Sequence, residues 1–125
     1  MEREGTVMKF EDLESWQLAR KLVSHVYALT RDPALVKDFG LCSQIQRATV
    51  SIMTNIAEGF ERTGLQEKIN FYNIARASAG EVRSLLYVIA DNYTQTSLYP
   101  DELQSEVKRI GKLLSGLIQS TEKRK

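Results

Sequence analysis

Residues 39–57 read FGLCSQIQRATVSIMTNIA, and Arg47 is the only charged residue among them. A helix this apolar, in a protein that folds in water, must be covered on more than one side. The stretch continues through residues 58–62 as EGFER, and the combined string is the most distinctive in the chain. We therefore expect the remainder of the chain to pack around this helix.

On a helical wheel the stretch divides into a polar stripe and two apolar faces. The stripe covers an arc of roughly 80° and consists of Gln44, Arg47, Ser51, Asn55 and Glu58. One apolar face consists of Leu41, Ile45, Ala48, Ile52 and Ile56, and the other of Cys42, Val50, Met53 and Ala57. A bundle core can take one apolar face, so the other predicts a homo-oligomer in which another subunit covers it.

The first helix is expected from Asp12 to about Thr30, because apolar residues recur there with the helical period. Asp12 is its expected N-cap. Pro33 ends the pattern, since proline disfavours a helical conformation in the residue before it. Residues 1–9 are short of apolar residues and contain glycine, which predicts a flexible lead-in to the fold.

The central helix is expected from residue 38 or 41 to residue 58, with Gly59 as its C-cap. Thr63 and Gln66 have the spacing of a capping box, in which each side chain bonds a free backbone N–H of the first turn. This spacing predicts a third helix that begins at residue 64 or 65 and ends at residue 91 or 92. Its run of small side chains would let another helix approach closely.

Polar residues 92–97 are expected to form the next loop. Pro100 suits the first position of a fourth helix, and Asp101 and Glu102 would then face the positive helix N-terminus. This helix should end at about Thr121, before a basic tail over residues 122–125. It has one narrow apolar stripe, so it is expected to bury a single side.

Four helices of similar length with short connections predict an all-α, up-down-up-down four-helix bundle over residues 10–121. Seventeen Lys and Arg residues against sixteen Asp and Glu residues leave a net charge of +1, which produces no strong global field. The N-terminus lacks the apolar run of a signal peptide, and no stretch has the length of a membrane span. We expect a cytoplasmic protein without a membrane partner.

The sequence offers little support for catalysis or a cofactor. Cys42 and His25 are the only cysteine and histidine, which cannot supply the usual structural zinc site, and neither lies in a nucleophile motif. Glu58 and Glu81 lack the Glu-x-x-His pairs of a diiron bundle. A glycine-rich phosphate loop is also absent from the sequence. We therefore expect a protein that is not an enzyme, with no catalytic, metal or cofactor residues.

The polar stripe of the central helix has two readings. In the first, its side chains hydrogen-bond one another or groups on the third helix such as Ser78, and thereby specify packing. In the second, the stripe faces a groove formed by subunit association and binds a polar ligand or a nucleic-acid backbone. On the first reading, the predicted packing or oligomer-interface residues are Arg47, Ser51, Met53, Asn55, Glu58, Arg76 and Glu81.

Basic residues also cluster locally despite the balanced overall charge. Lys108, Arg109 and Lys112 are expected on the exposed side of the fourth helix, and Arg62 lies at a helix boundary. In a ring-shaped oligomer, symmetry would repeat such a patch and create a multivalent phosphate-binding surface. These four residues are the predicted contacts to RNA or DNA. A structural or protein-binding scaffold without nucleic-acid affinity is the alternative.

Three segments resemble the 23S rRNA intervening-sequence protein family, whose members are small bacterial proteins. The most specific is QIQRATVSIMTNIAEGFER, over residues 44–62. FEDLESWQLARKLVSHVYALT, over residues 10–30, resembles the first helix of the family, and FYNIARASAGEVRSLL, over residues 71–86, resembles the third. The resemblance extends over about residues 10–118.

This resemblance implies an up-down-up-down four-helix bundle that assembles into a homopentameric ring. It implies no catalytic residue, since most members of the family have no assigned biochemical activity. A related accessory protein of diversity-generating retroelements forms a basic pentamer that binds nucleic acid and a reverse transcriptase. The present chain is nearly neutral and lacks that strongly basic character. The resemblance therefore adds a nucleic acid and a protein as expected partners, but the overall charge does not support the first of them.

Overall fold

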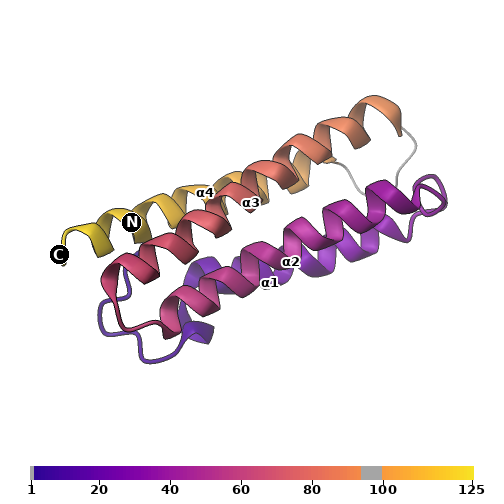
Figure 1. Cartoon of the computed structure of the whole chain (residues 1–125). Coiled ribbons are helices and arrows are strands. Elements are labelled where there is room, and N and C mark those ends of the chain that lie inside the picture. The colour runs from indigo at the N-terminus through magenta and orange to yellow at the C-terminus, as the bar shows by residue number, and fades with distance from the viewer. Residues whose placement is uncertain (1, 94–99) are drawn as a thin grey trace.

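The computed structural model describes residues 2–93 and 100–125 of the chain. Its described part is helical, with no β-strand. A short 3-10 helix, η1 (Phe10–Asp12), precedes four α-helices (Figure 1). These are α1 (Glu14–Thr30), α2 (Phe39–Glu61), α3 (Leu65–Asn92) and α4 (Pro100–Glu122).

The four α-helices form an elongated antiparallel bundle (Figure 1). Helix α2 packs on α1 and α3, and α4 packs on α3 and α1, so each helix has two neighbours. Glu2 lies beside the C-terminal end of α4, where Ser120 Oγ donates to its carbonyl. The prediction of an all-α four-helix bundle is therefore confirmed.

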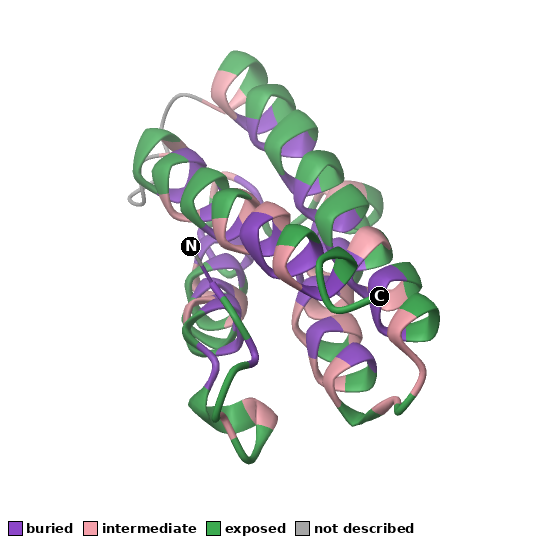
Figure 2. Ribbon diagram, turned by 90° about the vertical axis from the view of Figure 1, so that its left-hand side faces the viewer, coloured by how far each residue is buried: buried purple, intermediate pink, exposed green. Residues whose placement is uncertain are grey.

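The core runs along the middle of the bundle and takes a face of every helix (Figure 2). Helix α2 contributes one of its two predicted apolar faces, because Ile45, Ile52 and Ile56 are fully buried. Leucine and isoleucine from the other helices complete the interior. The largest fully buried side chains are Tyr72, Leu13, Leu22, Leu29, Leu35, Ile45, Ile52, Ile56, Leu86, Ile89, Ile110 and Leu114.

Two predicted helix caps are wrong. Asp12 lies in η1, and α1 begins two residues later after Leu13, an N-cap residue without a side-chain hydrogen bond. The N-cap of α3 is Gly64, again without a side-chain bond, and Gln66 donates to the Asn70 side chain instead of closing a capping box. The predicted starts of α3 and α4 are confirmed, and the predicted loop residues 94–97 lie outside the described residues.

The prediction of Gly59 as the C-cap of α2 is also wrong. Helix α2 continues to Glu61, and Arg62 is the C-cap, with its N–H donating to the Gly59 carbonyl. Gly59 is required by packing rather than by termination, because a Cβ built on it would lie 2.6 Å from Cε1 of the buried Tyr72 ring. Sequence alone cannot distinguish these two uses of a glycine near a helix end.

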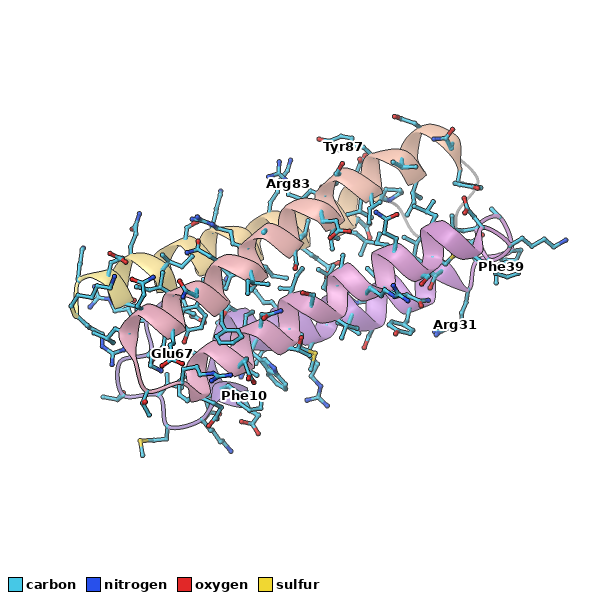
Figure 3. The ribbon with its side chains drawn as sticks, viewed as in Figure 1. Phe10, Arg31, Phe39, Glu67, Arg83 and Tyr87 are labelled. Carbon is cyan, nitrogen blue, oxygen red and sulfur yellow. The ribbon has the colours of Figure 1, made fainter. Side chains whose placement is uncertain are left out.

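Several large apolar side chains remain on the surface of the single chain. Phe39 and Tyr87 point away from the bundle, with exposed fractions of 77% and 55% (Figure 3). The second predicted apolar face of α2 is largely covered within the chain, because Cys42 is buried and Met53 and Ala57 are half-buried against the core. Val50, on the same face, is half-buried. Within the described residues, every helix is too short or too polar to span a membrane.

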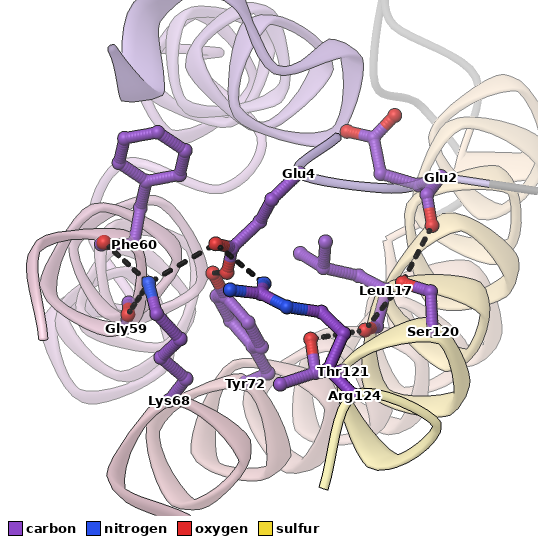
Figure 4. A network of polar contacts seen from close by, with 10 residues as sticks. All are labelled: Glu2, Glu4, Gly59, Phe60, Lys68, Tyr72, Leu117, Ser120, Thr121 and Arg124. Atoms are coloured by element: carbon purple, nitrogen blue, oxygen red, sulfur yellow. Dashed lines mark hydrogen bonds and ion pairs between the residues drawn. The ribbon is translucent and has the colours of Figure 1, made fainter. Parts of the chain in front are cut away.

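Residues 2–5, which we term the N-terminal strap, lie against the end of the bundle although residues 1–9 were expected to be flexible. Glu2 and Glu4 are buried, and the Glu2 carboxylate accepts the backbone N–H of Ser15 at 2.8 Å. The Glu4 carboxylate accepts the Tyr72 hydroxyl and contacts Lys68 Nζ at 3.0 Å (Figure 4). The strap is thus part of the packed structure.

At the opposite end of the bundle, Asp38 connects the start of α2 to the end of α3. Its carboxylate accepts the Leu41 N–H at 3.2 Å as the α2 N-cap, and it accepts the Tyr93 hydroxyl at 2.6 Å. The hydrogen bond from Tyr93, followed by that from Leu41, lowers the pKa of Asp38, because both bonds stabilise its ionised form.

Replacing Tyr93 by phenylalanine should remove part of the pH dependence of stability in acid. A lowered folded-state pKa means that Asp38 stabilises the fold above the ordinary aspartate value of about 3.9, and that this contribution is lost as the pH falls through the folded-state value. We expect Tyr93→Phe to be less stable than the wild type at neutral pH, with a difference that shrinks below about pH 4. Urea unfolding of the variant and the wild type between acid and neutral pH measures this difference in stability. A difference that does not change with pH would contradict the hydrogen bond from Tyr93 to Asp38.

Candidate nucleic-acid interface

A groove of about 630 Å³ runs between α3 and α4 on the surface of the bundle. Four of the residues that line it are cationic, and none of its described lining residues is acidic. Its remaining lining is small or uncharged. The full set is Arg76, Ala79, Gly80, Arg83, Val107, Lys108, Gly111, Lys112, Ser115, Gly116 and Gln119.

Helical spacing brings these cations to the same groove. Arg76 and Arg83 are two turns apart on α3, and Lys108 and Lys112 are one turn apart on α4, so each pair shares a helix face. Gly80 lies between the two arginines on α3, and the space beside it is open, because a Cβ built on it would meet no atom within 4 Å. Cations beside this open space leave room for an anionic chain.

The groove cations are available to a ligand. Arg76 donates to the Asn73 side chain at 3.0 Å and to Ser115 Oγ at 3.4 Å, which are neutral partners. Among the described residues, no ion pair involves Arg83, Lys108 or Lys112. Guanidinium and ammonium groups without a carboxylate partner are suited to phosphate oxygens.

The structure separates the four basic residues predicted to contact nucleic acid. Lys108 and Lys112 lie in the groove. Arg109 points elsewhere from α4 and pairs with Glu14 of α1 at 2.5 Å. Arg62 pairs with Glu58 at 2.8 Å, outside the groove.

The groove also contains cations that the sequence analysis did not assign to it. The sequence predicts Arg76 as a packing residue and predicts no role for Arg83. The signal for both is the i, i+4, i+7 spacing of residues 76, 80 and 83 on α3, which recurs on α4 as residues 108, 112 and 115. This signal becomes readable only when the two helices are known to pack against each other.

The polar stripe of α2 divides into separate contacts. Ser51 Oγ bonds Ser78 Oγ of α3 at 2.8 Å, and Asn55 Nδ2 donates to Ser51 Oγ at 3.0 Å. Arg47 and Glu81 are exposed and line a separate groove, of about 550 Å³, between α2 and α3. Ser51 and Asn55 thus have partners within the chain, as the packing interpretation predicts. Arg47 and Glu81 remain predicted residues of an oligomer interface.

The sole cysteine and histidine make separate contacts. Cys42 Sγ is buried and donates to the Leu35 carbonyl at 3.4 Å, and burial, assisted by the charge of Asp38, raises the pKa of its thiol. A raised pKa disfavours the thiolate that a nucleophile requires.

His25 Nδ1 pairs with Glu106 Oε1 at 2.7 Å. In residues 2–93 and 100–125, no group of three His, Cys, Asp or Glu side chains is arranged to hold a metal ion.

The fold and the groove define a small all-α protein, a four-helix bundle with a cationic groove between α3 and α4. The family model of the 23S rRNA-intervening sequence protein matches residues 11–116, so the chain belongs to this family. The predicted resemblance is confirmed.

Among solved structures, the bundle is similar to a protein of unknown function from the S23 ribosomal protein family of Bacteroides thetaiotaomicron. The TM-score is 0.74 at 23% sequence identity, over 84% of this chain and 98% of that one. At this identity the likeness concerns the fold. No curated protein matches the chain.

Proposed function

We propose that the protein is a non-enzymatic, homo-oligomeric interaction module that binds the phosphodiester backbone of RNA or DNA in the α3–α4 groove. The observation that carries this proposal is the gathering of Arg76, Arg83, Lys108 and Lys112 around one groove without an acidic residue among its described lining. Such a local cluster attracts phosphate even when the whole chain carries a net charge of only +1.

The groove favours binding that is independent of base sequence. Its described lining contains no aromatic side chain on which a base could stack. Contacts from lysine and arginine to phosphate position a nucleic acid but do not read its bases. The affinity should therefore decrease steeply with salt and vary little with sequence.

Homo-oligomerisation would repeat this groove and increase the avidity for a long nucleic acid. It is supported by the exposed Phe39 at the start of α2 and by Val50, which is half-buried on the same helix. The family resemblance makes a pentameric ring the expected assembly. In that ring, the exposed pair Arg47 and Glu81 would lie at or near a subunit boundary.

The double substitution Lys108→Gln and Lys112→Gln should weaken nucleic-acid binding. The slope of log K against log salt is negative, and removing two phosphate contacts is expected to make it shallower by about 1.8 for duplex DNA. The affinity at low salt should fall at least tenfold. Fluorescence anisotropy with single-stranded and duplex RNA and DNA measures both quantities. Because both side chains are exposed, the fold should be unaffected.

Arg109→Gln provides a matched control, because it removes a cation from the same helix that is paired with Glu14 outside the groove. It should leave the salt slope nearly unchanged. Absence of wild-type binding even at low salt would overturn the nucleic-acid proposal and favour a protein-binding scaffold.

Light scattering on the same samples tests assembly, and a monomer mass at micromolar concentration would overturn the homo-oligomer.

A further inference from the structure

We infer that the phosphate-binding surface continues beyond the α3–α4 groove, along α4, into a second pocket beside the N-terminal strap, where Arg3 and Lys123 contact further phosphates. This inference rests on the proposed function and extends the site to residues that neither the sequence motifs nor the groove includes. It assigns one continuous track, rather than an isolated groove, to a single phosphodiester strand.

The second pocket has a volume of about 250 Å³ and lies where the strap meets the end of α4. Its lining contains three cations and one carboxylate. That carboxylate, on Glu4, is already engaged by Lys68, Tyr72 and Arg124. The residues that line the pocket are Arg3, Glu4, Gly5, Ser120, Lys123 and Arg124.

The register of α4 connects the two cavities. Lys108, Lys112 and Gln119 line the groove, and Lys123 lies one helical turn further along the same face. The turn is continuous, because the Lys123 N–H donates to the Gln119 carbonyl at 3.1 Å. From Lys108 to Lys123 the track spans about 22 Å within an arc of roughly 80°. One strand of a duplex presents a phosphate about every 3.4 Å of axis, so a track of this length spans several phosphates.

The strap holds Arg3 toward solvent at the end of this track. Glu2 and Glu4 are buried on either side of it, whereas Arg3 is exposed. The Ser120 hydroxyl donates to the Glu2 carbonyl at 3.5 Å, which ties the strap to α4. Within the described residues, neither Arg3 nor Lys123 forms an ion pair. Both cations are therefore positioned but unneutralised.

The double substitution Arg3→Gln and Lys123→Gln tests the extension in the full chain. Binding of labelled duplex DNA and duplex RNA of mixed sequence is followed by anisotropy over a range of salt concentrations. Loss of two phosphate contacts should reduce the magnitude of the duplex-DNA salt slope by about 1.8. The slope should also fall with RNA, since the phosphodiester is the shared ligand.

The matched control is the double substitution Arg31→Gln and Lys37→Gln, which removes two exposed cations from the other end of the bundle. It should retain the wild-type slope. An unchanged slope for the Arg3 and Lys123 variant, with binding still weakened by Lys108→Gln and Lys112→Gln, would overturn the extension and leave the proposed function intact. Equal losses in the track and control variants would also overturn it, because they would indicate a general charge effect.

Discussion

Replacing Glu4 by alanine is expected to lower the free energy of unfolding by about 3 kcal/mol, because it removes one partner of a buried ion pair. The pair joins the Glu4 carboxylate to Lys68 Nζ at 3.0 Å, and the two side chains are 9% and 8% exposed. A loss of this size in a chain of 125 residues should reduce the melting temperature by about 10 °C at fixed protein concentration.

The cost arises from the groups that Glu4 would leave behind (Figure 4). Lys68 keeps a hydrogen bond to the Phe60 carbonyl at 2.7 Å but loses its buried counter-charge. The Tyr72 hydroxyl loses its acceptor inside the protein. Burial, reinforced by the bond to Glu4, raises the pKa of Tyr72 well above its ordinary value, so the hydroxyl keeps its proton and needs an acceptor.

Two comparisons separate this effect from loss of the strap in general. Arg3→Ala alters the neighbouring exposed residue and should change the unfolding free energy by less than about 0.5 kcal/mol. In a Lys68→Met background, Glu4→Ala should cost much less, because no buried ammonium remains to be neutralised. Thermal and urea unfolding measure all four variants. A Glu4→Ala protein as stable as the wild type would rule out the buried pair in solution.

Gly59→Ala is expected to lower the unfolding free energy by about 2 kcal/mol, even though alanine is the better helix former. The new Cβ would lie 2.6 Å from Cε1 and 2.8 Å from Cδ1 of Tyr72, and 3.1 Å from Cβ of Phe71. The Tyr72 ring is fully buried, and its hydroxyl is held by Glu4, so it has little freedom to move away.

Gly80→Ala is the matched control, since Gly80 is also inside a helix but a Cβ there would meet no atom within 4 Å. The same substitution should therefore have the opposite sign, with a gain of about 0.5–1 kcal/mol from helix propensity. Urea unfolding of the two variants side by side gives the comparison. If both glycines responded alike, the close approach of α2 to the Tyr72 ring would be wrong.

Periodicity predicted most of the architecture because each helix follows from its local pattern of apolar residues. The buried Ile45, Ile52 and Ile56 belong to one face of a single wheel, and the start of α4 at Pro100 follows from a local rule. The caps failed because local chemistry has several solutions. Asp12 satisfies the pattern of an N-cap, yet the chain forms a 3-10 turn there.

The candidate site was only partly predictable. Lys108 and Lys112 could be selected from α4 alone, since they share one helix face. Arg83 could not, because its role depends on which face of α3 meets α4, and that depends on packing between residues far apart in sequence. Arg109 differs from Lys112 by its pairing with Glu14, across a separation of 95 residues.

The sequence by itself determined the helices, their order and the need for α2 to be covered on more than one side, because these follow from the spacing of apolar and charged residues along one chain. Only the tertiary structure decided which cations share a groove and that Glu4 enters the bundle end. Those outcomes depend on contacts such as Glu4 with Tyr72, 68 residues apart, where the loss of hydration of a buried charge must be offset by partners that the local sequence does not contain.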